Sequence, residues 1–534
     1  MIERILYNGH ITTLNPPQKR VTALGITHGR IVVAGDDDEV LSYATAGTIK
    51  EDLQGHHVIP GLTDAHLHWE WTARALNEVD VFEVPSKEIA LERVAERASQ
   101  LPAGQWVTGQ GWSQAFWQDS RFPTAADLDS VAPNHPVVLL AKSGHAIWVN
   151  SLAVQIAGLT AATSDPDGGT IGRDEQGGLT GILFETAMGL VRRHIPEISL
   201  EQTVENMQSA QKLALASGLT GFHDFDGPSC LRALQVLRER NELSLRVVKN
   251  INKEWIEHAH ALGLRRGFGD DWIRIGGLKI FSDGALGPRT ALMVDTYENE
   301  PNNYGVRVTD KEEMYELVSK ASAAGLPSTI HAIGDLANRE VLDVYEAVRK
   351  EEAARGELPS TRRHRIEHVQ VLHPDDVSRF SELDIIASMQ PIHATSDYDM
   401  SDKHWGERSL YAYNPRIQLD QGVHVAFGSD SPVDPFAPLN GIFAAVTRRR
   451  PDGTPAKEGW YPDARLSVEE AVRGFTTGAA YAAGMEDRLG QLAPGFLADL
   501  VLLDRDLFSI STDEILDVEV IGTMVDGKWR FGGV

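Results

Sequence analysis

Eight short apolar runs alternate with helical stretches along most of this chain of 534 residues, and no other feature constrains its fold as strongly. Each run is rich in β-branched or other apolar residues and ends in polar ones, which is typical of buried strands joined by helices. The runs cover residues 57–68, 219–226, 245–252, 273–283, 327–335, 364–370, 385–392 and 423–430. Eight parallel strands with helices between them predict an α/β fold of the (β/α)8 barrel type, in which reactive groups lie at the carboxyl ends of the strands.

Two further pieces are expected around a barrel domain of residues 58–487. The stretch from about residue 70 to about residue 217 is too long for one strand-to-strand connection, so it predicts an inserted subdomain after the first strand. Both chain ends, residues 1–57 and 488–534, show short alternating runs and turn signals such as Asp526-Gly527. Neither end has enough strands to bury a core alone, so we expect the two ends to pair in one small composite β-sandwich.

Composition excludes several classes of partner. Acidic side chains outnumber basic ones by 76 to 50, and the formal net charge of −26 repels nucleic acids and anionic membrane surfaces. No apolar run is long enough for a membrane span, and the N-terminus lacks the features of a secretory signal. Cys230 is the only cysteine, so no intrachain disulfide can form. We expect a cytoplasmic protein with a small-molecule substrate and no nucleic-acid or membrane partner, and leave open whether it forms a homo-oligomer.

His66 and His68 form a His-x-His pair at the end of the first predicted barrel strand. Alternate residues of a strand point the same way, so both imidazoles face one point. Imidazole is the commonest protein ligand of divalent transition metals, and the pair is consistent with half of a metal site. An isolated pair is equally consistent with two histidines on a half-exposed strand, so the other strand ends must decide.

Four more polar residues fall at the ends of predicted barrel strands: Lys279, His331, His368 and Asp430. Taken alone, either histidine is as consistent with a hydrogen-bonded core residue or a strand cap as with a ligand. Together with the His-x-His pair, however, they occupy equivalent heights on strands that converge in a barrel. We therefore expect all six residues to share one metal centre.

Lys279 lies within an apolar strand, where an ammonium ion is costly. Desolvation lowers the pKa of a lysine, and the neutral amine can add carbon dioxide to give an anionic carbamate that bridges two cations. The alternative is a buried salt bridge from Lys279 to Asp283 or Asp430.

Five segments resemble, in order and spacing, motifs of the amidohydrolase superfamily, and together they span almost the whole chain. They are residues 60–68, 278–284, 330–335, 365–368 and 427–432. Residues 144–151 and 490–500 also resemble the branch, amidohydrolase family 3, that contains N-substituted formamide deformylases and exoenzyme-regulatory proteins. The resemblance implies a barrel with a composite β-sandwich.

The resemblance also implies a binuclear metal centre. The more buried ion would be held by His66, His68 and Asp430, the second ion by His331 and His368, and N-carboxylated Lys279 would bridge the two. Both ions are expected to be divalent, with zinc as the default, although the same ligand types suit other metals. A metal-activated hydroxide would be the nucleophile and Asp430 the general base, which would return the proton to the leaving amine. The implied enzyme hydrolyses a carbon–nitrogen bond other than a peptide bond, in a small N-acyl or N-formyl compound.

Three residues are candidates for substrate binding: His145 and Trp112 in the insertion, and Arg289 after the fourth strand. The alternatives are a loop histidine that caps its own backbone, a tryptophan in the core of the insertion, and an ordinary surface arginine. Residues 391–415, rich in His, Asp and Tyr, are a candidate lid.

Three other functions compete with an amide hydrolase. An ester or lactone hydrolase needs the same activated hydroxide, and the sequence does not separate the two. A mononuclear deaminase on the same fold would, by resemblance, carry a glutamate three residues after the fifth-strand histidine, where this chain has Gly334. The third alternative is a non-catalytic regulatory or ligand-binding protein, against which the complete set of candidate ligands argues.

Overall fold

The computed structural model describes every residue except 83, 115–116, 118–120 and 142–145. The chain forms two compact units. The first combines Met1–Trp71 with Met207–Val534, and the second is Thr72–Asn206, which lies within the predicted insertion. No helix in the described ranges is long and apolar enough to cross a membrane.

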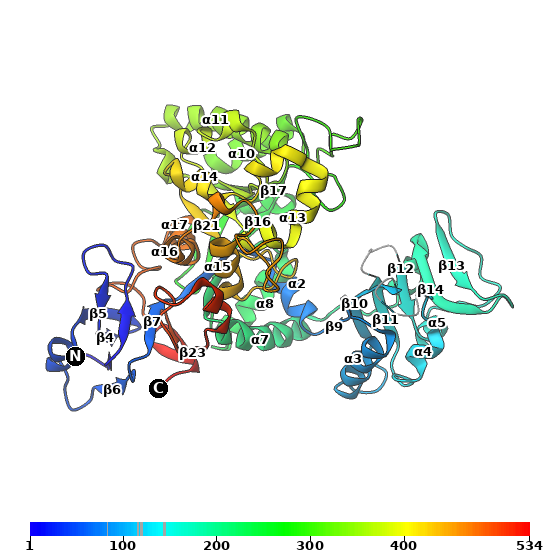
Figure 1. The fold of residues 1–534 in the computed structure, drawn as a ribbon, viewed down its shortest axis with the longest axis horizontal. Coiled ribbons are helices and arrows are strands. Elements are labelled where there is room, and N and C mark those ends of the chain that lie inside the picture. The colour runs from blue at the N-terminus through cyan, green and yellow to red at the C-terminus, as the bar shows by residue number, and fades with distance from the viewer. Residues whose placement is uncertain (83, 115–116, 118–120, 142–145) are drawn as a thin grey trace. The chain divides into compact units, whose positions relative to one another are not determined.

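An eight-stranded parallel sheet lies at the centre of the first unit (Figure 1). Its strands are β8 (Leu62–Leu67), β15 (Leu219–Asp224), β16 (Arg246–Asn252), β17 (Ile273–Phe281), β18 (Ser328–Ala332), β19 (Arg365–His368), β20 (Ile386–Met389) and β21 (Val425–Phe427). They pair in chain order, and each of the eight predicted runs contains one of them. Just past β21, Asp430 N donates to His66 O at 2.7 Å, and His68 N donates to Ser431 O at 2.9 Å. These bonds join the last strand to the first, so the sheet is a nearly closed barrel and the prediction is confirmed.

Helices follow the barrel strands and cover their outer faces (Figure 1). They are α8 (Pro228–Glu239), α9 (Ile256–Ala261), α10 (Lys311–Ala323), α11 (Asp335–Ala354), α12 (Arg379–Glu382), α13 (Pro391–Trp405), α14 (Pro415–Asp420), α15 (Pro438–Thr447), α16 (Val468–Arg473) and α17 (Ala479–Ala483). The apolar face of α11 includes Val341 and Val348, and Tyr345 on that face donates to Ser328 O at 3.0 Å. Residues 391–405, part of the candidate lid, form α13, and the first turn of this helix is buried.

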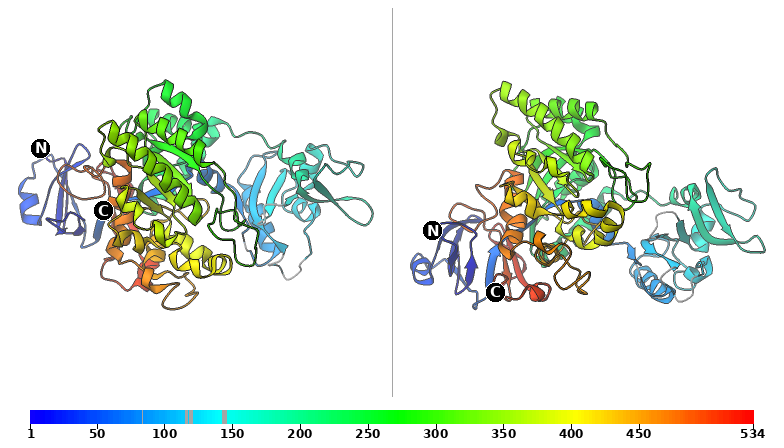
Figure 2. Two further views of the ribbon diagram at one scale, coloured as in Figure 1. Left: turned by 90° about the horizontal axis from the view of Figure 1, so that it is seen from above. Right: turned by 45° about the horizontal axis from the view of Figure 1, so that its top comes forward.

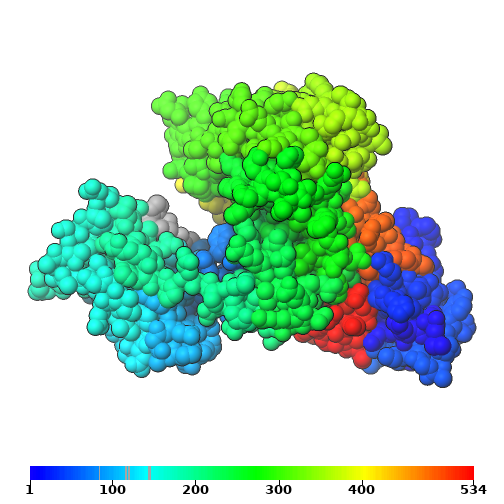
Figure 3. Space-filling view, turned by 180° about the vertical axis from the view of Figure 1, so that it is seen from behind, coloured from blue at the N-terminus to red at the C-terminus, as the bar shows by residue number. Residues whose placement is uncertain are grey.

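Two smaller sheets in the first unit are built from the chain ends (Figure 2). The blue N-terminal part and the red C-terminal part lie side by side in the space-filling view (Figure 3). One has the order β5-β4-β1-β6, and the other has the order β24-β23-β22-β7-β2-β3. Their strands are β1 (Arg4–Tyr7), β2 (His10–Thr12), β3 (Arg20–Val21), β4 (Ala23–Thr27), β5 (Arg30–Gly35), β6 (Ile49–Asp52), β7 (His57–Pro60), β22 (Leu500–Leu503), β23 (Val520–Val525) and β24 (Lys528–Gly532). Leu24 and Ile31 of the first sheet share one buried cluster with Leu500 and Met524 of the second. The two chain ends therefore form one composite sandwich, as predicted.

One predicted strand is two strands in the structure. Residues 57–60 form β7, which pairs with β22 in the terminal sheet, whereas residues 62–67 form β8 in the barrel. The chain changes sheets at Gly61, where an added Cβ would collide with Thr220 of the neighbouring strand. The apolar residues before Gly61 suit either sheet, so their pattern could not show this switch.

The second unit has its own six-stranded sheet, with the order β13-β14-β12-β11-β10-β9. The strands are β9 (Val79–Asp80), β10 (Val107–Trp112), β11 (Val137–Ala141), β12 (Ala146–Val149), β13 (Gly169–Arg173) and β14 (Leu179–Glu185). Helix α3 (Lys87–Ser99) contributes Val94 to a buried cluster that also contains Trp112, Trp117 and Trp148. The tryptophans of the insertion thus supply much of its core.

A buried carboxylate connects two barrel helices to the sheet. Glu352 of α11 is 1% exposed and accepts hydrogen bonds from Ser322 Oγ of α10 at 2.6 Å and from Arg349 Nη1 at 2.7 Å. It also accepts from His364 Nε2, just before β19, at 2.9 Å. Burial raises the pKa of Glu352, but the hydrogen bond and charge of His364, with the bonds from Ser322 and Arg349, lower that pKa to about 2.

Glu352→Gln should lower the free energy of unfolding by about 3 kcal/mol at pH 7, because the folded-state pKa lies below the unfolded one. That stabilisation is complete above the unfolded pKa of about 4.5 and is lost as the pH falls through the folded pKa. Urea midpoints of wild type and variant should therefore converge as the pH falls from 5 towards 3. The exposed Glu312→Gln serves as the control and should leave the midpoint unchanged. If the difference in urea midpoint between the wild type and Glu352→Gln does not change with pH, the low pKa assigned to Glu352 is wrong.

Candidate metal centre

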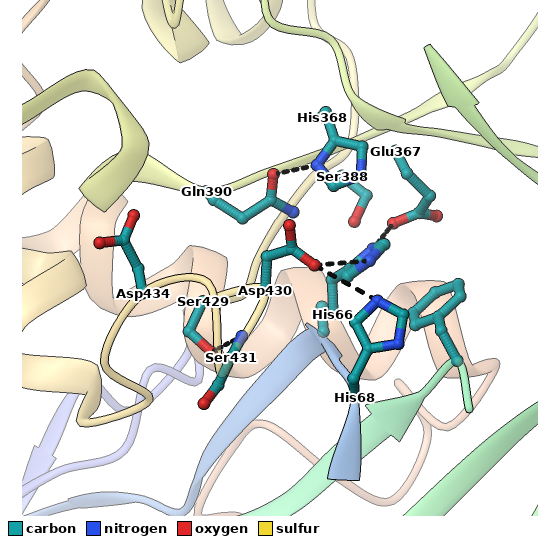
Figure 4. A network of polar contacts seen from close by, with 12 residues as sticks. His66, His68, Glu367, His368, Ser388, Gln390, Ser429, Asp430, Ser431 and Asp434 are labelled. Atoms are coloured by element: carbon teal, nitrogen blue, oxygen red, sulfur yellow. Dashed lines mark hydrogen bonds and ion pairs between the residues drawn. The ribbon is translucent and has the colours of Figure 1, made fainter. Parts of the chain in front are cut away.

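Two imidazoles at the end of β8, that of His66 in the strand and that of His68 just past it, converge on one carboxylate that follows β21 (Figure 4). His66 Nε2 lies 3.3 Å from Asp430 Oδ1, and His68 Nε2 lies 3.5 Å from the same oxygen. One ligand atom from each of His66, His368 and Asp430 lies within 4.8 Å of the other two. The structure thus brings the first, sixth and eighth strand ends together at one point, as the sequence predicts.

The other ring nitrogen of each imidazole faces a second carboxylate. His66 Nδ1 lies 2.6 Å from Glu367 Oε2, and His68 Nδ1 lies 3.0 Å from Asp226 Oδ1. A carboxylate accepts, so each Nδ1 carries a proton and the neutral ring keeps its lone pair on Nε2. Two lone pairs aimed at a carboxylate oxygen repel it, and a cation between them would remove that conflict. Consistent with this, His66 Nε2 is buried with no hydrogen-bond partner among the described residues.

The surroundings of His68 also favour a positive charge on its ring. Burial lowers its pKa, but the hydrogen bond to Asp226 and the negative charges of Asp430 and Asp226 outweigh burial, so the pKa of His68 is raised. A metal ion at Nε2 would compete with the second proton for this position, and its binding would release that proton.

His331 and His368 present lone pairs from β18 and β19. Nε2 of His331 donates to Gly284 O at 2.9 Å, so its lone pair is on Nδ1, whereas Nδ1 of His368 donates to Gln390 Oε1 at 2.8 Å, so its lone pair is on Nε2. The two ring centroids are 4.6 Å apart. Burial, aided by the charge of Lys279, lowers the pKa of His331 to about 3, and burial lowers the pKa of His368 well below its usual range. Both rings are therefore neutral at pH 7 and able to ligate.

Lys279 lies on β17 without a polar partner. Its side chain is 2% exposed, and Nζ lies 4.6 Å from the ring centroid of Phe225 and 4.5 Å from that of Phe281. Nζ makes no hydrogen bond within the described part of the chain. Burial lowers the pKa of Lys279 to about 8.

The salt bridge considered for Lys279 is absent from the described residues. Asp283 instead accepts backbone hydrogen bonds from Leu292 N at 2.9 Å, Ile333 N at 3.1 Å and Gly334 N at 2.9 Å. Asp430 faces the histidines, and no ion pair joins it to Lys279. The amine of Lys279 is therefore available for a role other than an ion pair with Asp283 or Asp430.

Strained backbone positions coincide with the ligand side chains. Asp430 has a φ of 60°, His368 a φ of 76° and Val369 a φ of 44°. Left-handed backbone is costly for residues with a Cβ, above all for β-branched valine, and it persists where the surroundings require it. At His368 it interrupts the alternation of β19, so Glu367 and His368 both contact the centre.

Sequence reasoning missed the residues that orient the histidines. Glu367 and Asp226 hold His66 and His68, and Gln390 holds His368. A fourth such residue is Asp64, whose Oδ1 accepts from His66 N at 2.9 Å and from Ser429 N at 3.1 Å. The carboxylate of Glu367 inside an apolar strand was an available signal, but its partner His66 lies far away in the sequence.

His393 at the start of α13 was also missed. It is 4% exposed, and its Nε2 lies 3.9 Å from Asp430 Oδ2 and 3.5 Å from Asp434 Oδ2. Its ring stacks on His368 with centroids 6.2 Å apart. His393 therefore borders the side of Asp430 that faces away from His66 and His68.

Of the three substrate-binding candidates, two have other partners and one falls outside the described residues. Arg289 is in the loop after β17, where it pairs with Glu300 at 2.8 Å and its side chain is 45% exposed. Trp112 is buried in the core of the second unit and donates Nε1–H to Leu139 O at 2.9 Å. This placement favours the core role for Trp112 over a substrate contact. His145 falls outside the described residues.

Comparisons with known proteins agree with this geometry. The model of the amidohydrolase family matches residues 51–531. The chain is 34% identical to Protein LONG AFTER FAR-RED 3 of Arabidopsis thaliana, over 98% of this chain and 91% of that protein. It is 30% identical to the N-substituted formamide deformylase of Arthrobacter pascens, over 99% of this chain and 98% of that protein.

A solved structure shows the same similarity. The crystal structure of an uncharacterized metal-dependent hydrolase from Pyrococcus furiosus superposes with a TM-score of 0.78 at 32% sequence identity, covering 95% of this chain and 100% of that one. Together with the match of the family model over almost the whole length, this similarity shows that the chain belongs to the amidohydrolase family.

Proposed function

We propose that this protein uses two divalent metal ions to hydrolyse a carbon–nitrogen bond, other than a peptide bond, in a small N-acyl or N-formyl compound. The observation that carries the proposal is the convergence of the Nε2 atoms of His66 and His68 on Asp430, with their Nδ1 atoms held by carboxylates. The similarity to an N-substituted formamide deformylase supports an N-formyl or N-acyl substrate.

The residues present fit two cations. The first would be held by His66, His68 and Asp430, the second by His331 and His368, and both by Lys279 as a carbamate. Neutral imidazoles and carboxylates suit zinc, which we propose as the metal. The unpartnered Nε2 of His66 and Nζ of Lys279 are two buried groups that this arrangement would satisfy.

Lys279 is suited to carboxylation. With a pKa of about 8, its amine is uncharged in a sizeable fraction of molecules near neutral pH. The amine lone pair forms a bond to the carbon of carbon dioxide, and a proton leaves the nitrogen, so a neutral group becomes an anionic carbamate. The anion would balance the cations and replace an ammonium that has no partner in the barrel.

Asp430 is placed to move the proton. Burial raises its pKa, but the nearby imidazoles of His66 and His368 bring that pKa well below its usual range, so the side chain is ionised at pH 7. The bound cations would supply Lewis-acid activation of water and of the substrate carbonyl. Asp430 would accept the proton of the attacking water and return it to the leaving nitrogen, which amide cleavage requires. Because the pKa of Asp430 is low, its protonated form would readily give this proton to the leaving nitrogen.

The mononuclear deaminase is disfavoured by the backbone as well as by the sequence. Gly334 begins α11, and a Cβ added there would collide with Leu292 O. No glutamate can occupy this position without a shift of the backbone. A non-catalytic regulatory or ligand-binding protein would not need a complete set of candidate metal ligands with two oriented histidines, which argues against that alternative.

Asp430→Asn should lower turnover of N-formyl and N-acyl amines at least a hundredfold, because the variant cannot accept the proton. The measurement is amine release from a panel of such compounds, with matched esters in parallel. Asp463→Asn, at an exposed position, is the control and should keep full activity. Wild-type turnover by Asp430→Asn would exclude the mechanism, and hydrolysis restricted to the esters would exclude the carbon–nitrogen assignment.

Asp226→Asn should weaken metal binding about tenfold or more, because His68 loses the carboxylate that orients its ring and fixes its tautomer. Competition with a chromophoric chelator measures the affinity. Asp463→Asn again serves as the control. An affinity equal to that of wild type would show that His68 does not need Asp226 to bind a metal.

A further inference from the structure

A second candidate site lies at the other end of the barrel. A pocket of about 250 Å³ is lined by Arg265, Arg266, Gly267, Arg274, Gly325, Thr361, Arg362 and Gly484. These residues come from loops that lead into strands, and Arg274 is near the start of β17, whereas Lys279 is near its end. The separation along β17 is about 16 Å, so the pocket is distinct from the metal centre.

The pocket gathers positive charge in a protein whose formal net charge is −26. Arg362 pairs with Glu357 at 3.0 Å, but Arg265, Arg266 and Arg274 form no ion pair with any carboxylate in the described ranges. Arg266 Nη2 and Arg274 Nε are buried and lack a hydrogen-bond partner among those residues. Buried guanidinium donors without acceptors are costly, which points to an absent anionic partner.

Two glycines make room for these guanidinium groups. Gly484 ends α17 with a φ of +69°, and a Cβ added there would collide with Arg266 Nη2. Gly267 has a φ of +78°, and its Cβ would lie 2.7 Å from Arg274 Nη2. The backbone therefore forms a close wall against which both side chains rest.

The charges also destabilise one another. Burial, with repulsion from Arg363 and Arg274, outweighs the attraction of Glu486 and lowers the pKa of Arg266 to about 10. Burial and the charge of Arg488 lower the pKa of Arg274 as well, against the attraction of nearby carboxylates such as Asp271. A bound anion would remove both penalties.

We propose that this pocket binds a phosphate group, either as free phosphate or as part of a small phosphorylated metabolite. Planar guanidinium groups bind phosphate oxygens through paired N–H donors, and the three arginines without an ion pair carry enough positive charge to neutralise a doubly ionised phosphate. The volume leaves space beside one phosphate for a small organic group. The inference does not rest on the hydrolase activity.

The test is isothermal titration of the metal-loaded protein with inorganic phosphate at constant ionic strength, with chloride as the reference anion. Arg266→Gln should weaken the phosphate affinity at least tenfold, and it should keep or raise the melting temperature in phosphate-free buffer because a repelling charge is gone. Arg232→Gln, an exposed arginine on α8, is the matched control and should change neither. Phosphate bound at the metal centre would persist in Arg266→Gln, so only the Arg266-dependent binding counts.

Glycerol 3-phosphate and ribose 5-phosphate distinguish the two sources of the phosphate group. Affinities at least tenfold above that of inorganic phosphate, lost in Arg266→Gln and in Arg274→Gln, would support a phosphorylated metabolite. Equal affinities with the same losses would support free phosphate. Binding that is absent, or that is unaffected by either substitution, would overturn the proposal. The proposal would also be overturned if the protein forms a dimer without phosphate and Arg266→Gln dissociates that dimer, because an acidic segment of a second copy would then fill the pocket.

Discussion

The buried carboxylate of Glu367 is the group on which the candidate metal centre depends. It accepts from His66 Nδ1 at 2.6 Å and from Arg365 Nη2 at 2.9 Å. Arg365 also donates to Ala65 O at 2.7 Å and to Ser388 Oγ at 2.6 Å, so one ion pair connects β8, β19 and β20. Removal of one member would leave a buried charge unpaired, at a cost of about 3–5 kcal/mol. Burial raises the pKa of Glu367, but the charge of Arg365 and the bond from His66 lower it well below its usual range.

From this ion pair the chemistry of the site follows in steps. Glu367 fixes the proton of His66 on Nδ1, Asp226 does the same for His68, and both rings then aim lone pairs at Asp430. A cation bound between the rings and the carboxylate would stabilise such an arrangement. The strained backbone at Asp430 is a further cost that a bound cation would offset, and the amine of Lys279, which has no hydrogen-bond partner among the described residues, would be satisfied as a carbamate between two cations. Fold, electrostatics and proposed function thus share one explanation.

The sequence was sufficient for the barrel, because buried parallel strands are continuous apolar runs and each of the eight was visible. It was insufficient for the switch between sheets at Gly61, where the runs of two sheets join without a break in pattern. Spacing within a strand shows which side chains share a direction, and so the convergence of His66 and His68 could be predicted. It does not show which distant residue orients them, which is why Glu367 and Asp226 were missed. The arginine pocket is built by separate loops and leaves no local pattern.

The most direct test is the metal content of the protein purified without chelators, beside that of Lys279→Met, which keeps the packing between Phe225 and Phe281 but cannot form a carbamate. Elemental analysis should find about two metal ions per chain in the wild type and a clear loss in the variant. About one ion per chain in both proteins would contradict a centre bridged by Lys279. No metal even after reconstitution would contradict the metal centre itself.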